Sequence, residues 1–119
     1  MPYVAMEAAA CWDLLGKPDT AVAIYERHTE GWPASQQRDR GLFLARLASS
    51  YAAQSNNDMA CATGWRALDL VRRATSVRAL RELLRLRTRL GAWRKDPEAA
   101  ELGDRIHRLL RPDARRSPV

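Results

Sequence analysis

The 119-residue sequence has few of the residues that organise secreted, metal-binding or β-rich proteins. Its two cysteines, Cys11 and Cys61, stand far apart with no CxxC or Cys/His cluster. This excludes a disulfide framework and a zinc-site signature. Glycine and proline number six each, too few for a collagen-like or low-complexity chain. β-branched residues are also sparse, so strands are not expected.

Signals for export, membrane insertion and catalysis are equally scarce. The first residues lack a basic stretch followed by an apolar run, and no window approaches the roughly 18 apolar residues of a membrane span. His28 and His107 have no Ser, Cys or carboxylate at a spacing that suits a nucleophile–base pair or a metal site. We therefore expect a cytoplasmic protein with no membrane partner, no cofactor, no metal and no enzymatic activity.

Charge is present and unevenly distributed. The net charge is +6, but residues 1–65 carry 5 basic and 7 acidic side chains, whereas residues 66–119 carry 15 basic and 7 acidic ones. All basic residues except Lys17 and Lys95 are arginines. A basic half indicates an acidic partner, such as an acidic peptide, an anionic surface or nucleic acid.

Helix-forming residues dominate the rest of the composition, and turn-forming residues mark the breaks between the expected helices. Ala, Leu, Arg and Glu favour helices. Turn-forming residues interrupt them at 16–19, 31–33, 54–58, 75–76 and 91–97. These breaks predict six helices in one domain over residues 1–111. A basic, disordered tail is expected over residues 112–119.

An internal repeat organises these helices into pairs. Ala9 and Trp12 recur 39 residues later as Ala48 and Tyr51, and a weaker third window runs over 80–91. The spacing resembles the tetratricopeptide pattern, with extra residues placed in the loop at 31–40. The resemblance implies an all-α, tetratricopeptide-like right-handed solenoid of about three helical hairpins. In it, small residues allow close helix approach and aromatic residues such as Trp12 fill the space between pairs.

A second resemblance covers about residues 5–95. The stretches 38–52, 64–70 and 76–83, followed by 90–93, resemble the C-terminal region of actinobacterial XRE-type helix-turn-helix transcriptional regulators. That resemblance implies the regulatory or oligomerisation part of such a regulator. The DNA-binding domain of that family precedes the repeats and has no counterpart here, so DNA binding is not implied.

The sharpest candidate site is on the fifth expected helix. Four arginines share the face opposite its leucines. In the repeat register, the first helix of each pair lines a groove, which favours an extended, acidic peptide or a C-terminal carboxylate held by guanidinium groups. The candidate groove residues are Arg78, Arg81, Arg85, Arg89, Ser49, Tyr3 and Met6.

Several alternatives stay open at this level. One alternative is that the arginine face of the fifth helix is an ordinary solvated face, and another is that it binds nucleic acid or another anion. A truncated regulator is a third alternative, and the apolar residues Tyr3, Val4 and Met6 would then promote a homodimer through the N-terminal helix. Arg87 lies among leucines, so we expect it to pair with a glutamate of the sixth helix or to extend past it.

Overall fold

The computed structural model describes residues 2–28, 32–33, 36–74, 76–93 and 95–110, with side chains from Val4 onward. Tail residues 112–119 lie outside this set. The described residues form six α-helices and one short 3₁₀ turn, and they contain no strand. The helices are α1 (Pro2–Leu14), α2 (Pro18–His28), α3 (Gln37–Ala53), α4 (Asn57–Arg73), α5 (Val77–Leu90) and α6 (Pro97–Leu110), with the turn η2 at Gly91–Trp93.

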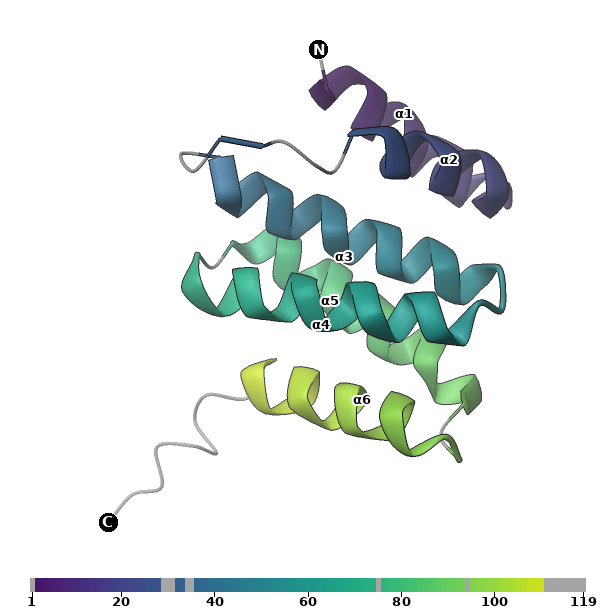
Figure 1. Ribbon diagram of the computed structural model, residues 1–119, viewed down its shortest axis with the longest axis vertical. Coiled ribbons are helices and arrows are strands. Elements are labelled where there is room, and N and C mark those ends of the chain that lie inside the picture. Colours follow the sequence, from purple (N-terminus) through teal and green to yellow (C-terminus); the bar gives the residue numbers. More distant parts are fainter. Residues whose placement is uncertain (1, 29–31, 34–35, 75, 94, 111–119) are drawn as a thin grey trace.

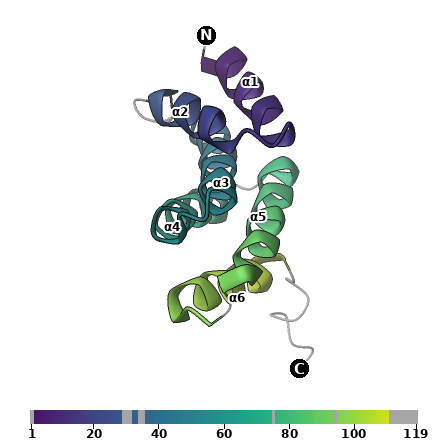
Figure 2. The same cartoon turned by 90° about the vertical axis from the view of Figure 1, so that its right-hand side faces the viewer.

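Consecutive helices run antiparallel in three pairs, α1 with α2, α3 with α4, and α5 with α6 (Figure 1). Seen from the side, α3 occupies the centre, with α1 and α5 on one side of it and α2 and α4 on the other (Figure 2). Helix α3 packs on α4, on α5 and on α2, which makes it the central helix of the fold. The predicted all-α class and six helices are confirmed.

Local chemistry accounts for several of the helix ends. The side chains of Asn56 and Ser76 accept hydrogen bonds from the backbone amides at the starts of α4 and α5. Pro18 is the first residue of α2, where its missing amide hydrogen costs nothing. Gly16 ends the first helix with a positive φ of 77°, a conformation that glycine adopts without strain.

The apolar core runs through all six helices and centres on α3. Small residues let the helices approach closely: Ala9, Ala21, Ala48 and Ala60 are all fully buried. A Cβ placed on Gly64 would lie 2.7 Å from Leu102 Cδ2, so the contact between α4 and α6 requires a glycine at this position. The expected role of small residues in helix packing is therefore seen here.

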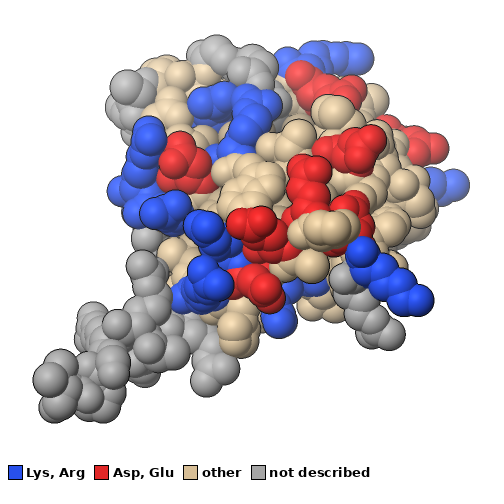
Figure 3. All heavy atoms as spheres, turned by 60° about the horizontal axis from the view of Figure 1, so that its bottom comes forward, with Lys and Arg blue, Asp and Glu red and all other residues tan. Residues whose placement is uncertain are grey.

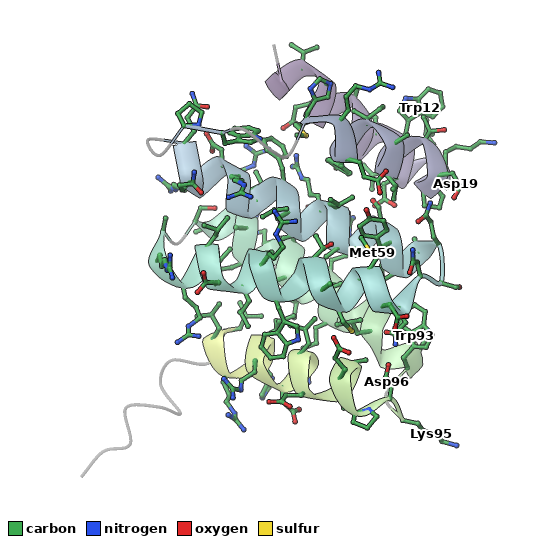
Figure 4. The ribbon with its side chains drawn as sticks, in the orientation of Figure 1. Trp12, Asp19, Met59, Trp93, Lys95 and Asp96 are labelled. Atoms are coloured by element: carbon green, nitrogen blue, oxygen red, sulfur yellow. The ribbon has the colours of Figure 1, made fainter. Side chains whose placement is uncertain are left out.

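Polar side chains link neighbouring pairs around this core. The Tyr51 hydroxyl donates to the Glu26 carboxylate, and the Asn57 amide donates to Asp96. Figure 4 shows Asp96 beside Trp93 and Lys95 at the turn before α6, on the same side of the view as Trp12. These bonds connect α2 with α3, and α4 with the turn before α6.

Three apolar residues of α1 and α5 are exposed, namely Cys11, Trp12 and Leu84. Cys11 is exposed because it lies about 200° around α1 from Ala9, which faces the core. Trp12 was expected between helix pairs, but it lies near the exposed turn that follows α1. Leu84 is exposed because α5 buries a narrower stripe, formed by Ala79, Leu83, Leu86 and Leu90. The predicted loop at 31–40 is shorter than expected, since α3 starts at Gln37.

Candidate functional site between α1, α3 and α5

Arg46, in the middle of α3, lies between carboxylates from two other helices. Its Nη1 donates to Glu7 Oε1 of α1 at 3.2 Å, and its Nε lies 3.6 Å from Glu82 Oε1 of α5. Its guanidinium carbon also lies 5.3 Å from the centroid of the Phe43 ring, within range of a cation–π interaction. Only 12% of the Arg46 side chain is exposed, so the two carboxylates compensate a largely desolvated charge.

Arg89 makes the second connection between the same three helices. Its Nη1 donates to the backbone carbonyl and the hydroxyl of Ser49 at 2.8 and 3.0 Å, and it pairs with Asp13 at 3.3 Å. The Asp13 side chain is only 7% exposed, so Arg89 compensates a buried carboxylate of α1. The structure thus brings together two predicted groove residues, Ser49 and Arg89, in a contact internal to the protein.

The remaining arginines of the α5 face differ from one another. Arg78 pairs with Glu7 at 3.2 Å, and Arg85 lies 3.8 Å from Glu82 of its own helix. Arg81 is exposed and has no partner among the described residues. Because three of the four arginines lie against carboxylates, this face has less excess positive charge than its sequence indicates. That arrangement does not favour phosphate contacts along α5.

A pocket of about 250 Å³ opens beside this network. Tyr25 of α2 lines it and is 1% exposed. The Nε of Arg46 is buried without a hydrogen-bond partner. The Tyr25 phenol and the Arg46 guanidinium are both hydrogen-bond donors, so this pocket suits a ligand with acceptor oxygens. Its lining comprises Glu7, Ala10, Cys11, Asp13, Leu14, Tyr25, Arg46, Glu82 and Arg85.

The electrostatics of the pocket fix the protonation states of two groups. Burial raises the pKa of Tyr25, and the nearby carboxylates of Glu82, Asp13 and Glu7 raise it further, against the opposing effect of Arg46. The phenol therefore stays protonated and can donate. Partial burial acts to raise the pKa of Glu7, but hydrogen bonds and charge from Arg46 and Arg78 outweigh it and hold that pKa below 4.5.

The other predicted groove residues are placed differently. Met6 is fully buried, so its prediction as a groove contact is wrong: it shares the core-facing side of α1 with Ala9, one turn away. Ser49 is also buried, and its hydroxyl is occupied by Arg89. The Tyr3 side chain lies outside the described residues.

Sequence reasoning missed the residues at the centre of the site, namely Glu7, Arg46, Glu82 and Tyr25. The first three occupy equivalent positions in the three repeat windows, which open at Ala5, Leu44 and Leu80, because each of them comes two residues after that opening residue. The available signal was that this one repeat position carries an acidic residue, then a basic one, then an acidic one. Such an alternation predicts a chain of ion pairs across the neighbouring helices, which we call the ion-pair ladder. Nothing in the sequence marks Tyr25 in the same way.

Arg87 follows one of its two expected courses. Its Nε donates to the backbone carbonyl of Gly103 at 3.2 Å, and its side chain passes beside that glycine. Glu101, an expected partner, pairs with Arg105 of its own helix instead. Arg87 therefore extends past α6 with its charged end in solvent.

Comparison of the chain with protein-family models, curated proteins and solved structures finds no match. Among the described residues, no group of three His, Cys, Asp or Glu side chains could hold a metal ion. No helix of the described part is long and apolar enough to cross a membrane.

Proposed function

We propose that the protein is a non-enzymatic, tetratricopeptide-like module that binds an extended peptide between α1, α3 and α5. The observation that carries this proposal is that the buried Tyr25 lines one pocket together with Arg46 and Arg85, so that a phenol and two guanidinium groups meet there. A peptide carboxylate would accept from the phenol and from a guanidinium. The antiparallel helix pairs and the 39-residue repeat support the solenoid arrangement.

The charges of the pocket suggest which carboxylate it takes. Arg85 is held loosely, at 3.8 Å from Glu82, and its side chain is 41% exposed. An incoming carboxylate can displace that contact at little cost, because exposed ion pairs contribute about 0–1 kcal/mol. The volume of about 250 Å³ accommodates one terminal residue of a peptide. We therefore propose that the pocket takes a C-terminal carboxylate or an acidic side chain.

A binding measurement with matched peptides tests this. Fluorescent peptide libraries with free or amidated C-termini would be compared on the wild type and on Tyr25→Phe, Arg85→Gln and the control Arg81→Gln. We expect free-acid peptides to bind, with at least tenfold weaker binding to the first two variants and unchanged binding to the control. No binding in either library, or equal effects of Arg81→Gln and Arg85→Gln, would contradict the proposal.

The resemblance to the C-terminal region of helix-turn-helix regulators supports a regulatory role for this module. In such a regulator, the peptide would be the signal that the repeat region senses. The test is the intact mass of the native polypeptide that carries this sequence. A mass larger by a helix-turn-helix domain supports the role, and a mass of 13.4 kDa makes the module a free-standing adaptor instead.

We also propose that α1 mediates a homodimer. Val4, Ala8 and Cys11 of α1 and Leu15 of the turn that follows it are exposed. They follow one another at intervals of four, three and four residues, the spacing of a coiled-coil seam. Both acidic residues of α1 are engaged by arginines of α3 and α5, so a second copy of this uncharged stripe would bury no unpaired charge. Because the stripe is uncharged and a second copy of the chain carries the same stripe, it favours a second copy as its partner over a charged protein.

A further inference from the structure

A second pocket, of about 240 Å³, lies between α4 and α6, on helices that do not line the groove. Three arginines converge on it from two helices: Arg72 of α4, and Arg105 and Arg108 of α6. Leu68 and Leu109 supply its apolar lining. Figure 3 shows basic side chains gathered toward one end of the α6 side of the molecule, with acidic side chains over the middle.

The charges of this pocket are less compensated than those of the groove. Arg105 lies 3.7 Å from Glu101, an exposed pair within one helix that contributes little. Arg72 and Arg108 have no carboxylate partner in the described part of the chain. By contrast, Arg46, Arg78 and Arg89 in the groove each face a carboxylate of another helix. The pocket between α4 and α6 thus carries an excess of about two positive charges.

Helix ends account for part of this arrangement. Arg72 and Arg108 lie in the last turns of α4 and α6, where cations interact favourably with the free carbonyl groups. That interaction would hold for each arginine separately. It does not explain why the two, together with Arg105 from an earlier turn, line one pocket with two leucines.

We propose that this pocket binds a phosphate group carried by a small organic molecule. Two uncompensated guanidinium groups match the double charge of a phosphate monoester, and each can donate a fork of two hydrogen bonds to tetrahedral oxygens. A single carboxylate would satisfy only one of the forks. The leucine lining would contact the organic part of the ester, so a monoester should bind more tightly than inorganic phosphate.

The test is a titration of the full chain, followed by amide chemical shifts at constant ionic strength. The probes are phenyl phosphate, inorganic phosphate and benzoate. The site variant is Arg72→Gln with Arg108→Gln. The matched control is Arg38→Gln with Arg81→Gln, which removes the same charge from exposed arginines of α3 and α5. All four side chains are exposed, so both variants should keep the helical circular dichroism and melting midpoint of the wild type.

We expect phenyl phosphate to bind at least tenfold more tightly than benzoate, with shifts confined to the ends of α4 and α6. The site variant should lose at least tenfold in affinity, and the control less than twofold. If inorganic phosphate binds as tightly as the ester, the ligand is the free ion and the leucines take no part. Equal losses in both variants, or benzoate binding as tightly as phenyl phosphate, would overturn the proposal by showing diffuse charge attraction.

Discussion

Arg46 donates to the Glu7 carboxylate at 3.2 Å, and the two residues are 39 positions apart, the spacing of the internal repeat. Equivalent positions of consecutive first helices are therefore in direct contact. Glu82 continues the series on α5 and lies 3.6 Å from the other side of the same guanidinium. One repeat position thus links α1, α3 and α5, and it also forms a wall of the pocket.

Removing Arg46 should destabilise the fold more than removing Glu7 or Arg81. Arg46→Ala would leave Glu82 largely buried without its partner on α3, and we expect a loss of about 3 kcal/mol. Glu7→Gln should cost under about 1 kcal/mol, because the Glu7 side chain is half exposed. Urea denaturation of the two variants and of the control Arg81→Ala measures this. Equal losses for Arg46→Ala and Arg81→Ala would show that the ladder contributes nothing.

The same contact makes stability depend on pH at the acidic end. The pKa of Glu7 lies below 4.5 in the folded protein, so its contribution is present above pH 4.5 and is lost as pH falls through the lower, folded value. We expect the melting midpoint to fall over that interval, and to fall less steeply in Glu7→Gln. Thermal melts at a series of pH values measure the two slopes, and parallel curves would contradict the assignment.

The sequence predicts more of the fold than of the candidate site. Helix ends follow from local chemistry, such as the Ser76 cap and the turn at Gly16, which neighbouring residues determine. The arginine face of α5 follows from helical periodicity. The partners of these arginines do not follow from periodicity. Glu7 and Asp13 belong to a helix about 70 residues away, and only packing decides which side chains meet. Met6 was misplaced for the same reason, since periodicity alone does not show which face of α1 meets α2.

The two cysteines should differ strongly in reactivity. Cys11 is exposed, whereas Cys61 is buried, and burial together with nearby carboxylates raises the pKa of the Cys61 thiol to about 11. In dilute native protein we expect one thiol to react rapidly with an aromatic disulfide reagent, and the second to react only on unfolding. Cys11→Ser should abolish the rapid phase. Rapid reaction of both thiols would show that the core around α4 opens readily.

Self-association should depend on the exposed stripe of α1. Leu15 is 71% exposed, and Leu15→Glu would place a charge in the proposed seam. We expect the wild type to show a mass that rises with concentration, and the variant to remain monomeric. Leu84→Glu is the matched control, since it makes the same change on an exposed leucine of α5. Sedimentation equilibrium measures the masses, and a wild type that is monomeric at all concentrations would refute the dimer.

Two glycines offer a test of packing between α4 and the last helix pair. A Cβ on Gly64 would lie 2.7 Å from Leu102 Cδ2 and 3.1 Å from Leu86 Cδ2, whereas a Cβ on Gly91 would meet nothing within 4 Å. Gly64→Ala must displace two buried leucines, so we expect a loss of about 1–3 kcal/mol. Gly91→Ala should change stability by no more than about 0.5 kcal/mol, because φ at Gly91 is −56° and suits any residue.

Urea denaturation of Gly64→Ala, Gly91→Ala, Leu102→Ala and the double variant Gly64→Ala/Leu102→Ala measures the effect. The double variant should cost less than the sum of its single changes, since the smaller side chain at 102 leaves room for the added methyl group. Strictly additive losses would mean that α6 does not pack on α4 through this glycine.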